Sequence, residues 1–175
     1  MQIKAKYIIE IFLSVLICYS LILYFKPFRP IEQNIRIEKI IVTKHKRTLD
    51  LISNDTIIKT YKVSLGRVPK GKKEFEGDKK TPEGKYIIDN KSSKSNYHKN
   101  LSISYPNQKD IENANKYDKN AGGLIKIHGI KNGFGWIGRF HLLFDWTLGC
   151  IAVTNREIDE LYELIEIGTP IEIKK

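Results

Sequence analysis

Cysteine is scarce in this chain of 175 residues, which contains only Cys18 and Cys150. Cys18 lies in an apolar N-terminal stretch, so we expect no intrachain disulfide, and a disulfide scaffold is excluded. Histidine is also rare, and no cluster of cysteine and histidine has the spacing of a zinc site. We therefore predict no metal and no cofactor, and Cys150 is left as a free thiol.

Acidic residues are outnumbered, with 20 Asp and Glu against 30 Lys and Arg, which gives a formal net charge of +10. Without residues 1–25 the charge is still +9, so the excess belongs to the rest of the chain. This charge suits a polyanionic neighbour such as nucleic acid, an anionic membrane face or a carboxylate-bearing polymer. By itself, a solvated lysine-rich surface is the simpler explanation. The lysines are scattered and no nucleic-acid-binding motif is present, so we expect no nucleic-acid partner.

One long hydrophobic run is present, at residues 7–25, interrupted by Glu10 and followed by Lys26. It is long enough to span a bilayer. We interpret residues 1–6 as a cytoplasmic N-terminus and residues 7–25 as a single transmembrane anchor. A cleaved signal peptide is the main alternative, with a weak site at residues 18–20, but the apolar residues continue past that site.

The charges that flank this run do not favour export, because basic residues stand on both sides of it. Lys4 and Lys6 precede the run, whereas Lys26, Arg29 and Arg36 follow it. The prediction that the remainder of the chain lies outside the cytoplasmic membrane, facing the periplasm or cell wall, therefore depends on the candidate site described below.

The residues after the hydrophobic run predict a linker at 26–36, stiffened by Pro27 and Pro30, and one domain at 37–175. Runs rich in Ile, Val, Thr and Tyr predict strands in a mainly antiparallel meander. These strands cover residues 35–42, 48–53, 56–65, 85–89, 101–105, 124–128 and 171–173, with a hairpin turn at Asn54-Asp55.

Two segments favour helices in this β-rich domain. Residues 110–117 form one short helix, and Asn155 is expected to cap a second whose apolar face includes Ile158, Leu161 and Ile165. The predicted fold class is mainly β, a β-sandwich or barrel with one or two helices.

Cys150 is the candidate nucleophile. A cysteine nucleophile needs a nearby base and backbone donors for the developing oxyanion. Gly149 allows an unusual backbone and a close approach of substrate, and the N–H groups of Gly149 and Cys150 precede the second helix. They are therefore candidate oxyanion donors. The alternative for Cys150 is an inert buried thiol.

Four histidines are available as the base. His45 lies in a basic, exposed segment, His98 in a polar loop, and His141 precedes an apolar run. His128 ends an apolar strand and is followed by Gly129, so its ring can project at a sheet edge. A core histidine bonded to the backbone is an equally good interpretation of His128 from the sequence alone.

Three ordered blocks together resemble one family. They are residues 77–88, which contain Thr81-Pro82, then Ile127-His128-Gly129, then Thr147-Leu148-Gly149-Cys150. In this order they resemble the L,D-transpeptidase (YkuD-type) catalytic domain, and residues 167–173 resemble its last strand. The resemblance covers residues 37–175 and is much more specific than any single block.

The resemblance implies a cysteine acyltransferase of peptidoglycan biosynthesis that acts in cell wall organisation and cell shape. Its substrate is a tetrapeptide stem, attacked between the third residue and the terminal D-alanine. An amine on another stem then resolves the acyl-enzyme and forms a 3→3 cross-link. The implied partners are peptidoglycan stem peptides, the membrane through the N-terminal segment, and a wall-attached protein as a further substrate.

The same resemblance assigns roles to individual residues. Cys150 is the nucleophile, His128 the general base and acid, the Gly129 carbonyl orients His128, and Gly149 belongs to the oxyanion hole. Four further residues are predicted to bind substrate: Trp146, Thr147, His141 and Asp145.

Two positions depart from the family pattern and keep alternatives open. Leu148 replaces a common histidine, and Ala152 replaces an arginine often found two residues after the cysteine. A hydrolase of the same fold is therefore an alternative, acting as an L,D-carboxypeptidase or releasing wall-attached protein. An inactive wall-binding module is another, and a general cysteine protease lacks a supporting triad signature.

Overall fold

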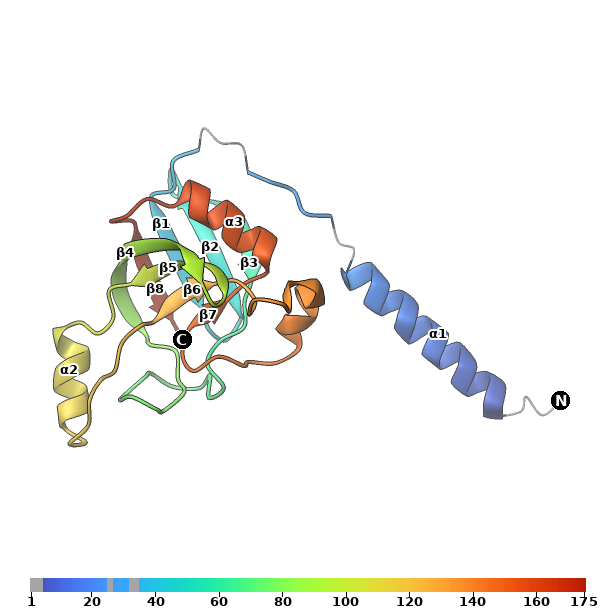
Figure 1. Cartoon of the computed structure of the whole chain (residues 1–175), viewed down its shortest axis with the longest axis horizontal. Helices are drawn as coiled ribbons and strands as arrows, with labels where there is room; N and C mark the ends of the chain where they lie inside the picture. Colours follow the sequence, from blue (N-terminus) through green and yellow to red (C-terminus); the bar gives the residue numbers. More distant parts are fainter. Residues whose placement is uncertain (1–4, 25–26, 32–34) are drawn as a thin grey trace.

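The computed structural model describes residues 5–24, 27–31 and 35–175 (Figure 1). Parts of the predicted N-terminus, anchor and linker fall on residues 1–4, 25–26 and 32–34 and lie outside the described residues. In chain order the elements are α1 (Ala5–Tyr24), β1 (Lys39–Thr43), β2 (Thr48–Ser53), β3 (Thr56–Lys62), β4 (Gly84–Ser95), β5 (His98–Ile103), α2 (Gln108–Asn115), β6 (Lys126–His128), the 3-10 segment η1 (Gly135–Leu143), β7 (Ile151–Ala152), α3 (Asn155–Leu164) and β8 (Pro170–Lys174).

The strands form one sheet in the order β3-β2-β1-β8-β4-β5-β6-β7. The β-rich class with a few helices is confirmed. The antiparallel meander is wrong at two places, since β1 pairs in parallel with β8 and β6 pairs in parallel with β7. Parallel neighbours need a crossover connection, and η1 lies in the one that joins β6 to β7. This crossover carries the candidate nucleophile.

Most predicted elements are present with shifted ends, and the end of one strand differs greatly. Strand β2 covers the predicted residues, and Asn54 and Asp55 both have positive φ, as the predicted hairpin turn requires. Strand β4 runs to Ser95, well beyond the predicted end at Asp89. Its polar second half lacks a strand-like sequence but pairs with β5, so tertiary pairing extends it.

The N-cap residue of α3 is Thr154, one residue before the predicted cap at Asn155. The Thr154 side chain accepts the N–H of Glu157, and the Glu157 carboxylate accepts the N–H of Thr154 at 2.8 Å, which forms a capping box. Asn155 instead accepts the N–H of Ile130 at 2.8 Å. The start of α3 is thereby tied to the chain that leaves β6.

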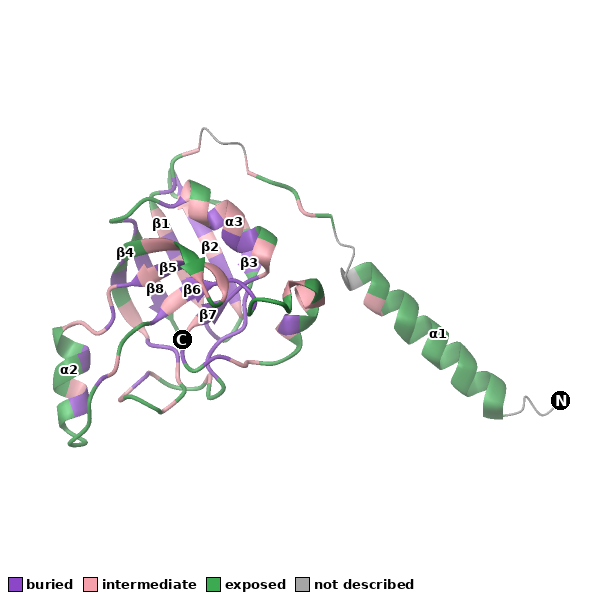
Figure 2. Ribbon diagram, viewed as in Figure 1, coloured by how far each residue is buried: buried purple, intermediate pink, exposed green. Residues whose placement is uncertain are grey.

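The core lies between the sheet and α3, which packs against β5 and β6 (Figure 2). Each Ile or Leu that becomes fully buried stabilises the fold by about 1.5–3 kcal/mol. The fully buried aliphatic side chains include Ile40, Leu49, Leu51, Leu65, Ile88, Leu101, Ile127, Ile130, Ile151, Ile158 and Leu161.

Helix α1 extends away from the β-rich domain in Figure 1 and contacts it at η1. Its segment Ala5–Ile22 has a mean hydropathy of 1.9 and is long and apolar enough to cross a membrane. A signal sequence has the same properties, so α1 is a candidate span.

The chain after α1 is bound to the domain at several points. Lys59 Nζ lies 4.3 Å from the ring centroid of Phe28 and donates to the Arg29 carbonyl at 2.6 Å. The N–H of Ile31 donates to Glu160 of α3, also at 2.6 Å. Residues 28–31 therefore belong to the surface of the domain, although they were predicted as part of a linker.

Candidate functional site

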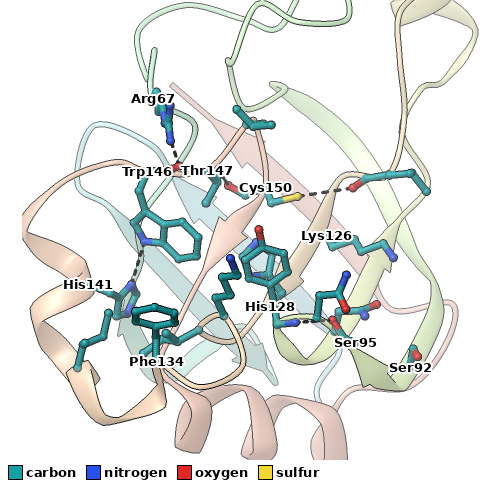
Figure 3. Close-up of a pocket in the computed structure, with 18 of the residues that line it drawn as sticks. Arg67, Ser92, Ser95, Lys126, His128, Phe134, His141, Trp146, Thr147 and Cys150 are labelled. Carbon is teal, nitrogen blue, oxygen red and sulfur yellow. Dashed lines mark hydrogen bonds between the residues drawn. The ribbon is translucent and has the colours of Figure 1, made fainter.

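A cavity of about 1350 Å³ opens beside η1 and is lined by Cys150 and His128 (Figure 3). Trp146 and His141 also line it, with the Trp146 ring between the rings of His128 and His141. The polar end of β4 and the loop before β5 complete the wall. The three sequence blocks do not all reach this cavity, since Thr81 lies elsewhere, as described below.

Sheet pairing brings the cysteine and the histidine together. Strand β6 pairs in parallel with β7 through Ile127 and Ile151, and through His128 and Ala152. Cys150 directly precedes β7, so it stands beside β6. Ile127 is fully buried in the core, and its neighbour His128 therefore points to the other face, which lines the cavity.

His128 is held by the residue that follows it. Its Nδ1 lies 2.7 Å from the carbonyl oxygen of Gly129. A carbonyl only accepts, so Nδ1 carries the proton and Nε2 is left as an acceptor. Burial lowers the pKa of His128 to about 4, with the Lys126 charge adding to the decrease and the Gly129 hydrogen bond opposing it. The imidazole is therefore neutral at pH 7, with Tyr97 packed against it at 4.6 Å between ring centroids.

Cys150 is half-buried, and burial raises the pKa of its thiol. A hydrogen bond from the Lys126 backbone and the charges of Lys126 and Lys73 oppose this rise. Sγ lies 3.5 Å from the carbonyl oxygen of Leu124. The site at pH 7 thus holds a neutral thiol and a neutral imidazole, and proton removal must accompany attack by sulfur.

Thr147 fixes the loop that carries the cysteine. Its hydroxyl accepts the N–H of Gly149 at 3.1 Å and donates to the carbonyl of Cys150 at 2.7 Å. The N–H of Gly149 is therefore already bonded to the Thr147 hydroxyl, and its place in the oxyanion hole stays a prediction. The N–H of Cys150 makes no hydrogen bond with any residue that the structure describes, so it is available as a donor.

Gly149 is required for a different reason. Its φ is +133°, and a Cβ atom there would lie 2.8 Å from the carbonyl oxygen of Lys80. The neighbouring Thr81 is fully buried, and its hydroxyl accepts the N–H of Gly66 at 3.0 Å. The Thr81-Pro82 block thus packs behind the cysteine loop and shapes it without lining the cavity.

Asp145, which was predicted to bind substrate, is bonded to other residues of the chain through both carboxylate oxygens. It does not line the cavity. One carboxylate oxygen pairs with Arg47 Nη2 at 2.7 Å and the other accepts the N–H of Leu65 at 2.9 Å. Both oxygens therefore bind the loop that carries Cys150 to two other segments, the turn at Arg47 and the chain at Leu65.

Trp146 and His141 both line the cavity, as their predicted role requires. The indole N–H of Trp146 donates to His141 Nδ1 at 3.4 Å, and the Trp146 ring meets His128 edge-on at 5.7 Å. His141 is almost completely buried, which lowers its pKa to about 4. Neutral His141 thus positions Trp146 against His128.

The other two histidines lie away from the cavity. His45 contacts the Lys175 carbonyl, and His98 contacts Asp159 at 2.8 Å.

Sequence reasoning missed Lys126 and Tyr97 at the site. A signal for Lys126 was present, because it lies two residues before His128 in an apolar strand. Among the described residues, no group of three His, Cys, Asp or Glu side chains can hold a metal ion.

A parallel β6–β7 pair that presents histidine and cysteine to one cavity defines the class of protein. The family model described as "YkuD: L,D-transpeptidase catalytic domain" matches residues 38–173. The chain belongs to this family, which confirms the resemblance of its three sequence blocks, and its fold is the L,D-transpeptidase fold.

Individual relatives agree with this assignment. The chain is 30% identical over 130 residues to "Putative L,D-transpeptidase YafK" of Escherichia coli (strain K12), covering 71% of this chain and 45% of YafK. Pgp2, the helical cell shape determining protein from Campylobacter jejuni, has 23% identity and a TM-score of 0.60. Bd1075 from Bdellovibrio bacteriovorus has 26% identity and a TM-score of 0.56. Each match to these two structures covers 81% of this chain and 49% of the other. The chain thus spans about half the length of these relatives, or less.

Proposed function

We propose that this chain is a peptidoglycan L,D-transpeptidase that works through an acyl-enzyme on Cys150. The observation that carries the proposal is the placement of Cys150 and His128 on neighbouring strands at one cavity, with Nδ1 of His128 bonded to Gly129. That bond leaves Nε2 as the atom that takes the thiol proton. Membership of the family supports the peptidoglycan stem as the substrate.

In the first half-reaction the sulfur of Cys150 attacks the carbonyl carbon of the third stem residue. His128 removes the thiol proton as the S–C bond forms, because both groups are neutral at rest. The N–H of Cys150 donates to the oxyanion. The C–N bond to the terminal D-alanine then breaks, and His128 gives the proton to the leaving amine.

In the second half-reaction an amine attacks the thioester, and His128 removes its proton. Sulfur leaves and regains a proton, so the enzyme returns to its neutral resting state. When the amine belongs to another stem, the product is a 3→3 cross-link. Water in place of the amine gives hydrolysis, the carboxypeptidase alternative.

Helix α1 supports a placement at the cytoplasmic membrane. Membership of the family supports a domain at residues 37–175 that faces the periplasm or cell wall. The positive charge of the chain, +10 overall, suits stem peptides and wall polymers that carry carboxylates. A wall-attached protein is a second substrate class under the hydrolytic alternative.

The test uses the full chain in detergent with disaccharide-tetrapeptide fragments and mass spectrometry of the products. We expect cross-linked dimers, or exchange of D-alanine for an added D-amino acid. Release of D-alanine without dimers or exchange would identify the hydrolase. No turnover by the unmodified chain would favour the wall-binding module. Cys150→Ala is the control and must abolish every activity, since retained turnover in this variant rules out the mechanism.

A further inference from the structure

One cation stands beside both reacting side chains. Lys126 and His128 lie two residues apart on β6, so both point to the cavity while Ile127 between them is buried in the core. The pairing of Ile127 with Ile151 places Lys126 next to Cys150 on the adjacent strand. Figure 3 shows Lys126 on the same side of the cavity as Cys150, with Trp146 between His128 and His141.

The ammonium group of Lys126 has no acidic partner among the described residues. The more deeply buried lysines differ, since Lys44 is paired with Glu83 and Lys73 with Asp78. Burial is the main cause of the pKa shifts of His128 and Cys150, and the Lys126 charge lowers the pKa of both. An uncompensated, half-buried cation at a cavity is suited to bind a carboxylate.

The proposed reaction places a carboxylate at this point. His128 must reach the nitrogen of the leaving amino acid to protonate it. In an α-amino acid the carboxylate carbon is two bonds from that nitrogen, each of about 1.5 Å. Lys126 and His128 are separated by about 6.5 Å along the strand, a gap that the flexible lysine side chain can cover. A leaving D-alanine at His128 therefore carries its carboxylate to Lys126.

We propose that Lys126 is a specificity residue that binds the carboxylate of the leaving amino acid, so that the enzyme cleaves only the last peptide bond of a stem. The inference rests on the proposed function. In this step the S–C bond forms and the C–N bond breaks. The proton passes from Sγ through His128 to the amine, while the carboxylate stays ionised and bound to Lys126.

The same contact selects the acceptor. We assign the incoming amine to the place that the leaving amine vacates, as microscopic reversibility requires when one α-amino acid is exchanged for another. The ammonium of Lys126 therefore favours acceptor amines that carry a carboxylate on the same carbon. Amino acids and the side-chain end of a diamino dicarboxylic acid have this group, whereas simple amines and amino acid amides lack it.

The first experiment compares stem tetrapeptides that end in D-alanine or in D-alaninamide, using the full chain. We expect the amide to react about 10- to 100-fold more slowly, the range of a hydrogen bond to a charged group. Lys126→Met should slow the carboxylate substrate by the same factor and leave the amide unchanged, whereas Lys126→Arg retains the preference. Lys131→Met removes another cavity lysine and should keep the unmodified ratio. An unmodified chain without a preference, or a preference that persists in Lys126→Met, overturns the inference.

A second measurement needs no turnover and separates this inference from the proposed function. Iodoacetate and iodoacetamide both alkylate Cys150, with iodide as the leaving group, and differ only in the carboxylate. We expect Lys126→Met to lower the iodoacetate to iodoacetamide rate ratio about tenfold relative to the unmodified chain and to Lys131→Met. Any change in the Cys150 pKa affects both reagents equally and cancels in the ratio. An unchanged ratio rejects Lys126 as a carboxylate site even if the chain is an active transpeptidase. A lowered ratio in a chain without turnover supports the site and rejects only the proposed function.

Discussion

His128 Nδ1 lies 2.7 Å from the carbonyl oxygen of Gly129, the next residue in the chain. The orienting acceptor is therefore a backbone group that no side-chain substitution removes. A neutral acceptor raises the imidazole pKa less than a carboxylate does, so burial dominates and the pKa falls to about 4. The contact with Gly129 therefore sets the tautomer of His128, and burial sets its lowered pKa.

The pH dependence of activity should reflect the lowered pKa of His128. His128 acts as a base only when it is neutral, so kcat/KM should fall as the pH drops through about 4, not through 6.5. Measured rates on a tetrapeptide fragment should be nearly constant from pH 5.5 to pH 7. An acid limb centred near 6.5 would contradict the buried, neutral histidine.

Replacing His128 tests its role as the base. We expect His128→Ala to lower kcat by at least about 10²-fold, the lower range for general acid–base catalysis. His141→Ala is the matched control, because His141 is also buried and lines the same cavity. It should lower activity less, through the loss of support for Trp146. A larger loss in His141→Ala would reverse the assignment of the base.

Thr147 should be needed for activity through its hydroxyl. Thr147→Val keeps the shape of the side chain but leaves the N–H of Gly149 and the carbonyl of Cys150 without their partner. We expect a loss of about 1–3 kcal/mol in stability and a lower kcat as the loop relaxes. Thr147→Ser retains the hydroxyl and should restore most of both. Equal thermal melting and equal kcat for Thr147→Val and the unmodified chain would exclude this role.

Stability should decrease on acidification because two buried histidines are neutral in the fold. His128 and His141 both have pKa values lowered to about 4 from 6.5. Between these values the unfolded chain binds more protons, so stability is complete above pH 6.5 and is lost as the pH falls toward 4. We expect the Tm to be lower at pH 5 than at pH 7. The double variant His128→Gln, His141→Gln should show a smaller difference, and an equal one would assign the effect to other groups.

The cap of α3 offers a test away from the cavity. Thr154→Ala removes the side-chain acceptor of the Glu157 N–H and should destabilise the protein by about 1 kcal/mol. Asn155→Ala, the residue predicted from sequence to be the cap, instead breaks a bond to Ile130. Measurements of kcat should separate the two variants. Asn155→Ala disturbs the chain after β6 and should lower kcat, whereas Thr154→Ala should lower only the melting temperature.

Local patterns predicted much of this molecule. The hairpin at Asn54-Asp55 and the apolar face of α3 follow from turn chemistry and helical periodicity, and both are found. His128 and Cys150 were paired through the ordered family blocks, and sheet pairing does bring them to one cavity. The family and the fold were predicted in the same way and are confirmed.

Other features depend on contacts between distant residues. Gly149 and Asp145 were assigned to the site through the family resemblance. Their hydrogen-bonding groups are occupied by Thr147 and by Arg47, and no pattern in the sequence reveals those partners. The end of β4 was missed for the same reason, since its strand conformation comes from pairing with β5 and not from propensity.

The binding of residues 28–31 to the domain limits how far the active cavity can travel. Helix α1 ends at Tyr24, and Phe28 already contacts Lys59, so four peptide links separate the two. Fully extended, they cover at most about 15 Å. With α1 as the membrane anchor of the proposed function, the enzyme is confined to a thin layer next to the bilayer. Under the proposed function, stems deeper in the wall then lie outside its range, and the strands within reach are those nearest the bilayer.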